Sequence, residues 1–281
     1  MLRISADHPI DASTVRILRH LRVACDRLDV PVLLAGAGAR DLLLENVYGL
    51  DPGRATRDLD FAVAVQSWGQ FFALRKSLTS TAEFIDVHPG RPHRLMYGSV
   101  PVDLLPFRGV ENDLAQVSWP PEMKVVMNVA GYEEVLDSAV SVSVEPHWDI
   151  RVASLPGLAL MKIFAWVDRG AVNSKDALDL VTLCRTYADA GNLDRVFHQE
   201  QAMMQLVDYA MERASPWLLG LDLKRSISIS TTERLMTVLH DTKRRNQLAV
   251  DMSRALAQTG DPYAAAQNLL SDFMQGLRGN P

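Results

Sequence analysis

Two aspartates stand two residues apart in an otherwise apolar segment, and a third lies in a similar segment further along the chain. Asp58 and Asp60 flank Leu59, and because side chains alternate across a strand, both carboxylates leave the sheet on one face. Two unit charges about 4 Å apart repel by roughly 4 kcal/mol at an effective dielectric near 20, so the pair requires a cation. Asp103 lies between apolar neighbours in a predicted strand over residues 100–106. Buried acids of this kind are usually paired or bound to a metal.

The carboxylate pattern favours a divalent ion bound entirely by oxygen. Mg²⁺ suits such sites and keeps positions for water and substrate phosphates, and Mn²⁺ accepts the same ligands. We therefore predict that Asp58, Asp60 and Asp103 hold Mg²⁺, with Mn²⁺ as a possible substitute. No histidine spacing suggests zinc.

A run of small residues precedes the paired acids. Residues 32–44 read VLLAGAGARDLLL, which predicts a short strand, a tight turn at Gly36 and a helix from Ala39. Backbone N–H groups in such a turn bind phosphate. A phosphate-binding turn next to a metal site indicates nucleotide chemistry.

The remaining patterns describe the elements that position these residues. Asp11 or Ser13 caps a helix that ends before Pro31, and Ser67 caps a helix whose core-facing stripe holds Trp68, Phe71, Phe72 and Leu78. Predicted strands cover residues 83–88, 93–98, 100–106, 124–128, 135–144 and 149–153, with turns at Pro89-Gly90 and Gly98-Ser99. Predicted helices after residue 155 cover about 158–166, 175–187, 193–214, 232–245, 247–258 and 264–277. The fold class is a mixed-sheet α/β domain over residues 1–154, followed by an all-helical domain over 155–281 that closes over the cleft.

The amino-acid composition limits which binding partners the protein can have. The 281 residues carry a net charge of −5, so nucleic acid must be bound by a local basic patch. The candidate is Lys243-Arg244-Arg245 with Lys224-Arg225, and the alternative is a solvated helix end. Cys25 and Cys184 lie in apolar helical patterns, which predicts buried, reduced thiols. No signal peptide or membrane span is evident. We expect a cytoplasmic protein without a membrane partner.

The order of these motifs resembles the polymerase-beta-like nucleotidyltransferase superfamily over about residues 32–107. That family has an apolar strand, Gly-Gly or Gly-Ser, a helix, an Asp-x-Asp strand and a third Asp; Gly36-Ala37, Asp58-x-Asp60 and Asp103 follow the same order. The letters GAGARDLLL are similar to the opening of tRNA CCA-adding enzymes and poly(A) polymerases. Two other segments favour a different branch, the AbiEii-type toxin nucleotidyltransferases: residues 54–61 (RATRDLDF), and the helical motifs of residues 162–169 (KIFAWVDR) and 175–180 (KDALDL).

The resemblance implies roles for residues on both sides of residue 155. Asp58, Asp60 and Asp103 would be catalytic metal ligands. Gly36, Ala37, Gly38 and Arg40 would bind the nucleotide, and Lys162 would contact phosphate with Asp176 orienting it. For several of these residues a purely structural role remains open. Asp58 could cap the turn after Thr56, Asp103 could pair with an arginine such as Arg94, Lys162 could form an ion pair with Asp176 or Asp179, and Arg40 and Asp41 could fix the turn through salt bridges.

The implied activity is transfer of a nucleoside monophosphate from an NTP, ATP among them, to an acceptor hydroxyl. By resemblance the acceptor is RNA, with a tRNA 3′ end as one candidate, or a protein side chain, and the chain acts as a toxin with a separately encoded antitoxin protein. One alternative is a transferase for a small molecule such as an aminoglycoside. Another is an inactive nucleotide-binding regulatory module, since Ala37 lacks the hydroxyl that the family's serine would supply.

Overall fold

The computed structural model describes residues 1–54, 56–87, 92–121, 123 and 126–279, and the chain forms two compact units. Met1–Gly49 and Ala55–Ser154 make up the first unit, and Leu50–Arg54 joins Leu155–Pro281 in the second. Within the second unit, Arg54 of this short segment forms an ion pair with Asp179 at 3.4 Å.

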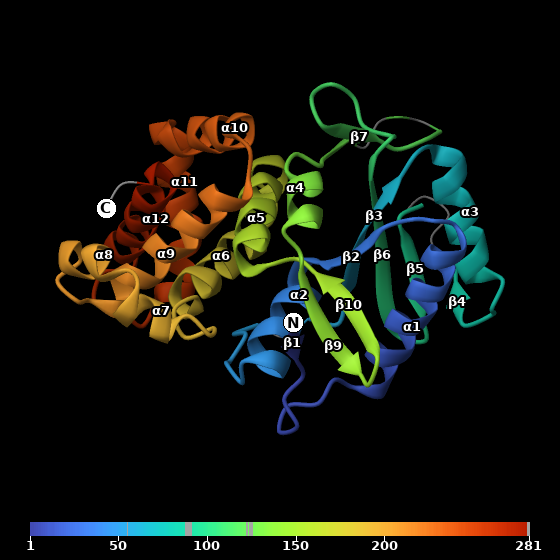
Figure 1. The fold of residues 1–281 in the computed structure, drawn as a ribbon. Coiled ribbons are helices and arrows are strands. Elements are labelled where there is room, and N and C mark those ends of the chain that lie inside the picture. Colours follow the sequence, from blue (N-terminus) through green and yellow to red (C-terminus); the bar gives the residue numbers. More distant parts are fainter. Residues whose placement is uncertain (55, 88–91, 122, 124–125, 280–281) are drawn as a thin grey trace. The chain divides into compact units, whose positions relative to one another are not determined.

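The first unit is built on a mixed eight-stranded sheet with the strand order β1-β9-β10-β2-β3-β6-β5-β4 (Figure 1). Its strands are β1 (Leu2–Arg3), β2 (Val32–Ala35), β3 (Leu59–Val65), β4 (Phe84–Ile85), β5 (Arg94–Tyr97), β6 (Val100–Arg108), β9 (Val140–Glu145) and β10 (Trp148–Val152). A separate two-stranded sheet pairs β7 (Gln116–Ser118) with β8 (Val126–Asn128). The helices are α1 (Ala12–Arg27), α2 (Gly36–Asp41), continued by the π-helical turn η1 (Leu42–Val47), α3 (Trp68–Thr79) and α4 (Tyr132–Asp137).

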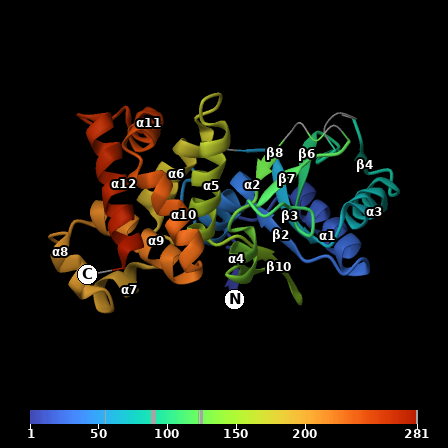
Figure 2. The same cartoon turned by 90° about the horizontal axis from the view of Figure 1, so that it is seen from above.

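Local signals explain why the main elements form. Asp11 caps α1 by accepting from the backbone N–H of Ser13 and Thr14 at 2.9 and 3.0 Å, and Ser67 caps α3 by accepting from Gln70 N. Strand β3 is buried along almost its whole length, which fits a central strand covered on both faces. Figures 1 and 2 show α1 and α3 side by side over the sheet.

Three expectations for this unit need correction. The helical stripe places Phe72 in the core, but that side chain is 42% exposed, whereas Leu74 on the same helix is fully buried. The predicted strand over residues 135–144 is wrong at its start, because α4 occupies Tyr132–Asp137 and the strand begins at Val140. The helix predicted from Ala39 begins three residues earlier, at Gly36. The Pro89-Gly90 turn and the beginning of the strand predicted over residues 124–128 lie outside the described residues.

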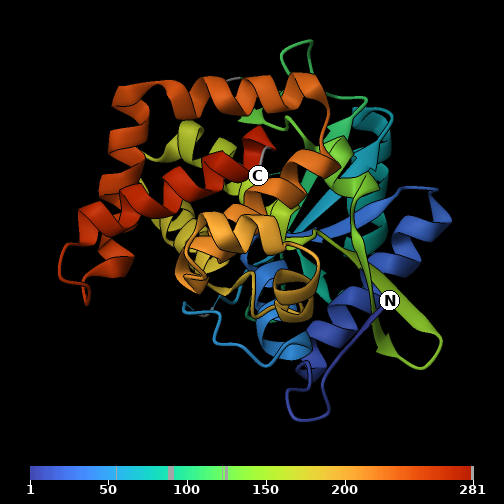
Figure 3. The ribbon, with the colours of Figure 1, turned by 60° about the vertical axis from the view of Figure 1, so that its left-hand side comes forward.

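The second unit consists of helices α5 (Leu155–Arg169), α6 (Lys175–Thr186), α7 (Leu193–His198), α8 (Gln201–Leu206), α9 (Met211–Ser226), α10 (Ile229–His240), α11 (Thr242–Ser253) and α12 (Pro262–Arg278), with a 3-10 turn η2 (Arg254–Leu256). Figure 3 shows α12, in red, among the orange helices that surround it. Helices α9 and α12 cross in close contact, because a Cβ atom at Gly220 would overlap Phe273 O and one at Gly276 would overlap Trp217 O. A larger residue at either glycine would force the two backbones apart.

The helical content of this unit agrees with the sequence analysis, but its division does not. The segment predicted as one helix over residues 193–214 contains α7, α8 and the start of α9. The chain breaks between α8 and α9, where Asp208 and Tyr209 take left-handed φ values of 53° and 58°. Such values end a helix regardless of its apolar spacing. Among the described residues, no helix is long and apolar enough to cross a membrane.

Candidate active site

The predicted catalytic carboxylates lie on neighbouring strands at one level of the sheet. Parallel pairing of β3 with β6 puts Asp60 opposite Asp103, and antiparallel pairing of β5 with β6 puts Arg94 opposite Asp103. Directly opposed residues on neighbouring strands point to the same face. Asp58 comes one residue before β3 and shares the side-chain direction of Asp60. We call Asp58, Asp60, Asp103 and Arg94 the strand cluster.

Arg94 is the cation of the strand cluster. Its Nε donates to Asp103 Oδ1 and its Nη2 to Asp103 Oδ2, both at 2.7 Å, and Nη2 also reaches Asp58 Oδ2 at 3.5 Å. Such two-point pairing of guanidinium with carboxylate is among the stronger interactions in proteins. Hydrogen bonding to Asp103 raises the pKa of Arg94 against the effect of burial, and the charges of Asp103, Asp58 and Asp60 act in the same direction. The alternative pairing of Asp103 with Arg94 is therefore present.

The predicted turn lies directly against Asp60. Antiparallel pairing of β2 with β3 puts Ala35 opposite Asp60, so Gly36 follows at once. Gly36 has φ +63°, and a Cβ atom there would overlap the Asp60 carboxylate. A Cβ atom at Gly38 would come within 2.8 Å of Leu59 Cδ2. Glycine is required at Gly36 by backbone conformation as well as by space, whereas a Cβ atom at Gly38 would need only the end of the Leu59 side chain to shift. Ala37, between them, is buried.

Arg40 is buried and paired with the neighbouring Asp41. Its side chain is 1% exposed, and its Nε and Nη2 donate to Asp41 Oδ1 at 2.8 and 2.5 Å. Asp41 Oδ2 in turn accepts from the backbone N–H of Thr56 at 3.2 Å, which ties η1 and α2 to the segment before Asp58. The Arg40–Asp41 salt bridge that the sequence left open is therefore present, and nucleotide binding by Arg40 stays a prediction.

The donor chemistry of the strand cluster fits a magnesium ion, since three carboxylates from two adjacent strands are the ligands that this ion prefers. Within the described residues, however, no three Asp, Glu, His or Cys side chains are grouped as a metal site. The carboxylates are arranged around the Arg94 guanidinium instead. Asp58 remains accessible, with 48% of its side chain exposed, whereas that of Asp103 is 11% exposed.

The two site residues predicted in the helical unit are in direct contact. Lys162 Nζ lies 3.2 Å from Asp176 Oδ1 and 2.5 Å from Asp179 Oδ2. Arg169 donates to both oxygens of Asp176, at 2.7 and 3.0 Å. Both aspartates are 1% exposed and Lys162 is 8% exposed. We call Lys162, Arg169, Arg54, Asp176 and Asp179 the helix cluster.

Charge and burial compete in the helix cluster. Burial by itself would raise the pKa of Asp176, but the hydrogen bonds from Arg169 and the charges of Lys162 and Arg169 outweigh it and lower that pKa. Asp176 is therefore held as a carboxylate inside the unit. The structural ion pairs of Lys162 with Asp176 and Asp179, left open by the sequence, are both present.

From the sequence, Arg94 is expected only as a pairing partner of Asp103. A signal existed, because the Gly98-Ser99 turn joins two strands in a hairpin that brings residue 94 opposite residue 103. The additional contact with Asp58 could not be deduced, since it depends on the pairing of β6 with β3.

A comparison with protein-family models identifies the family. The model described as "Nucleotidyl transferase AbiEii toxin, Type IV TA system" matches residues 17–270. The chain belongs to this family. Its activity class is thus that of a nucleotidyltransferase, and the AbiEii branch favoured by residues 54–61, 162–169 and 175–180 is confirmed. Among curated proteins, none matches the sequence.

Solved structures similar to this AbiEii family member share little sequence with it. One is ANT(2'')-Ia in complex with adenylyl-2''-tobramycin, at 12% identity over 68% of this chain and 99% of that one, with a TM-score of 0.40. Another is an antigenic nucleotidyltransferase-like protein from Paracoccidioides brasiliensis, at 15% identity over 72% and 92% of the two chains, with a TM-score of 0.39. The CCA-adding enzyme of Thermotoga maritima, complexed with tRNA, shows 12% identity over 97% and 82%, with a TM-score of 0.27.

Proposed function

We propose that the protein transfers a nucleoside monophosphate from an NTP to an acceptor hydroxyl in a Mg²⁺-dependent reaction that releases pyrophosphate. The observation that carries this proposal is the strand cluster, in which acids from two strands surround one cation beside the Gly36 turn. Metal-dependent phosphoryl transfer depends on such convergence of carboxylates next to a place for phosphate.

Each residue of the strand cluster has a role in this proposal. Asp58, Asp60 and Asp103 would hold Mg²⁺ or Mn²⁺. A bound divalent ion supplies charge neutralisation for the triphosphate and lowers the pKa of the attacking hydroxyl. With no side chain at Gly36, the backbone of the turn lies against Asp60, so triphosphate oxygens can meet backbone N–H groups and the metal ligands together. Ala37 contributes its N–H to the same turn.

The proposed contribution of the helical unit is Lys162, which would contact a substrate phosphate while Asp176 orients its ammonium group. The support is chemical: three cations surround two carboxylates in the helix cluster, so its formal charge is positive and suits an anion. Removing Lys162 would also disturb the fold, because its partners are buried.

The proposed acceptor is RNA, with a tRNA 3′ end as the first candidate, or a protein side chain. The proposed biological role is that of a cytoplasmic toxin with a separately encoded antitoxin, and the family description supports this role. The support for RNA is the exposure of Lys243 and Arg244 at the start of α11, where both side chains can approach a phosphate backbone.

The test incubates the purified chain with Mg²⁺, each α-³²P-labelled NTP in turn, and total cell RNA or total cell protein, and then locates the label on a gel. We expect one acceptor class to take up label from at least one NTP. Asp60→Asn should reduce the labelling rate by about 10³-fold, because loss of a metal ligand removes several kcal/mol of transition-state stabilisation. Asp26→Asn, an exposed change on α1, is the matched control and should keep the wild-type rate.

Three outcomes would contradict parts of the proposal. Equal labelling by Asp60→Asn would exclude the metal-binding role of the strand cluster. Labelling that persists undiminished in EDTA would exclude the metal requirement. NTP binding without label in any acceptor would identify the chain as a nucleotide-binding regulatory module.

A further inference from the structure

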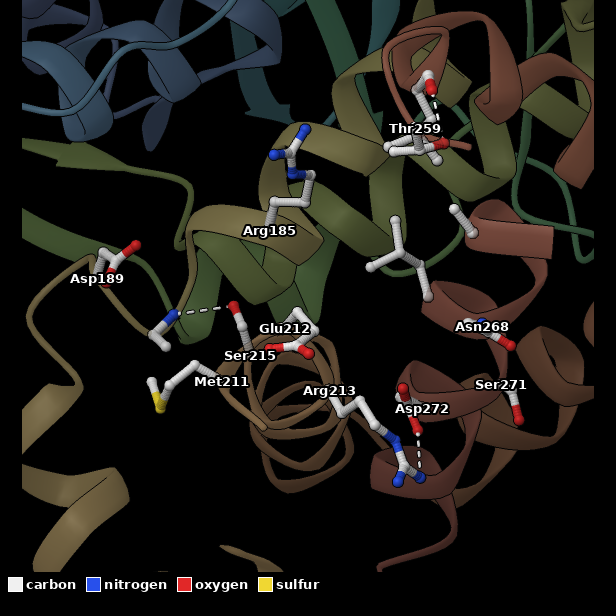
Figure 4. Close-up of a pocket in the computed structure, with 14 residues that line it drawn as sticks. Arg185, Asp189, Met211, Glu212, Arg213, Ser215, Thr259, Asn268, Ser271 and Asp272 are labelled. Atoms are coloured by element: carbon white, nitrogen blue, oxygen red, sulfur yellow. Dashed lines mark hydrogen bonds and ion pairs between the residues drawn. The ribbon is translucent and has the colours of Figure 1, made fainter. Parts of the chain in front are cut away.

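A pocket of about 720 Å³ lies inside the helical unit, between the end of α6, the first turns of α9 and α12, and the turn η2 (Figure 4). Its volume is within the range of about 300–1,000 Å³ that small-molecule sites occupy. Leu256 and Leu269 supply apolar wall, and Glu212 and Arg185 supply polar rim. All of its lining residues belong to the helical unit, and none belongs to the strand cluster or to the helix cluster.

Asp272 is the buried charge of this pocket. It is 5% exposed, and its one hydrogen bond within the described residues comes from Arg213 Nη2 to Oδ1, at 3.4 Å. That distance is long for a charge-assisted hydrogen bond, which is usually 2.7–2.9 Å. The Arg213 side chain is 44% exposed, so water weakens its attraction further. Oδ2 accepts no hydrogen bond within the described part of the chain.

Asp176 shows what a fully satisfied aspartate looks like in the same unit. Asp176 is 1% exposed and receives donors from Lys162 and Arg169, which lower its pKa. For Asp272, burial raises the pKa, and the hydrogen bond and charge of Arg213 offset only part of that effect. A buried carboxylate normally binds several donors. The fold therefore leaves acceptor capacity of Asp272 unused at the wall of an open pocket.

We propose that this pocket binds a small organic amine, whose ammonium group donates to Asp272 while its apolar body contacts Leu256 and Leu269. A cation is favoured over an anion because three acids line the pocket, Asp272, Asp189 and Glu212. They outnumber the two arginines of its lining, Arg185 and Arg213, which are both exposed. An organic cation is favoured over a metal ion because the space is far larger than one ion and part of its wall is apolar. The bound amine would supply Asp272 Oδ2 with the donor that the protein lacks.

The test titrates the purified chain at pH 7.5 with cyclohexylmethylamine and, in parallel, with cyclohexylmethanol, using calorimetry or amide chemical-shift changes. The two probes share shape and apolar area, but only the amine carries a charge at this pH. We expect the amine to bind about tenfold more tightly than the alcohol, as a charge-assisted hydrogen bond should produce. Asp272→Asn should bring both probes to similar affinity, whereas Asp272→Glu should keep the preference for the amine.

Two control substitutions show whether the amine binds at Asp272 itself. Asp189→Asn on the exposed rim should change amine affinity by less than about twofold. Asp60→Asn should leave amine binding intact, so the result is independent of nucleotidyl transfer. The proposal is overturned if the wild-type chain binds the alcohol as tightly as the amine, or binds neither at about 10 mM. It is also overturned if folded Asp272→Asn keeps the preference.

Discussion

The strand cluster and the helix cluster both combine aspartates with basic side chains, but they differ in charge balance and in contact with solvent. The four side chains of the strand cluster carry a formal charge of −2, whereas the five of the helix cluster carry +1. Asp58 in the strand cluster is 48% exposed, and Asp176 and Asp179 in the helix cluster are 1% exposed.

The two clusters therefore differ in what their charged side chains can do. In the proposed function, the acids of the strand cluster exchange the Arg94 guanidinium for a metal ion, and Asp58 is the acid that solvent reaches. Acids enclosed by lysine and arginine are fixed partners, and removing one partner leaves the others buried and unmatched, which is costly. We therefore expect substitutions in the strand cluster to change chemistry and those in the helix cluster to change stability first. The following predictions are ordered by expected size.

The largest expected effect on stability is that of Asp176→Asn. The change leaves Lys162 and Arg169 without a carboxylate that accepts from both, and breaking a buried pair in this way costs about 3 kcal/mol or more. The melting temperature should fall by roughly 6–12 °C, as followed by circular dichroism. Asp60→Asn should melt within about 2 °C of the wild-type chain, and exposed Asp189→Asn is the control within the helical unit. Equal melting of Asp176→Asn and the wild-type chain would remove the distinction between the clusters.

A smaller effect is expected when the guanidinium of the strand cluster is removed. Arg94→Gln should bind Mn²⁺ about tenfold more tightly, equivalent to about 1.4 kcal/mol, because the metal no longer competes with Arg94 for Asp103. Electron paramagnetic resonance of Mn²⁺ measures this without nucleotide or turnover. Arg75→Gln, which breaks the Arg75–Asp86 pair elsewhere in the same unit, is the control. Unchanged or weaker Mn²⁺ binding by Arg94→Gln would show that the guanidinium and the metal do not compete.

The smallest effect concerns pH. Because the folded pKa of Asp176 is lowered from 3.8, its contribution to stability is present above that unfolded value and is lost as the pH falls through the folded pKa. The difference in urea midpoint between the wild-type chain and Asp176→Asn should therefore be constant near pH 7 and should shrink below about pH 4. A difference that stays constant down to pH 3 would mean that the carboxylate charge of Asp176 is not what stabilises the folded state.

The sequence predicts the fold best where one residue pattern determines one element. The caps Asp11 and Ser67 indicate correct starts for α1 and α3, and the apolar run up to Val65 indicates the central strand β3. A short helix such as α4 cannot be predicted in this way, because six residues from Tyr132 show too little periodicity to be distinguished from a strand. The prediction for Phe72 is wrong because position in a helical stripe does not specify which neighbours cover the stripe.

The sequence predicts which residues form the candidate site better than it predicts the contacts between them. The order of Gly36, Asp58, Asp60 and Asp103 could be taken from the chain, and β-pairing places Asp60 next to both Ala35 and Asp103. The sequence could not decide between a free metal ligand and an ion pair for Asp103, because the position of Arg94 depends on strand register. The burial of Arg40 could not be predicted either, because the exposure of a side chain depends on how the elements of the unit pack together.

The alignment of Ala35, Asp60, Asp103 and Arg94 across β2, β3, β6 and β5 makes any catalytic geometry here a property of backbone pairing. A slip of β3 by a single residue would turn Asp60 to the opposite face and present Leu59 or Phe61 in its place. Incorrectly paired molecules would thus be inert rather than altered in specificity.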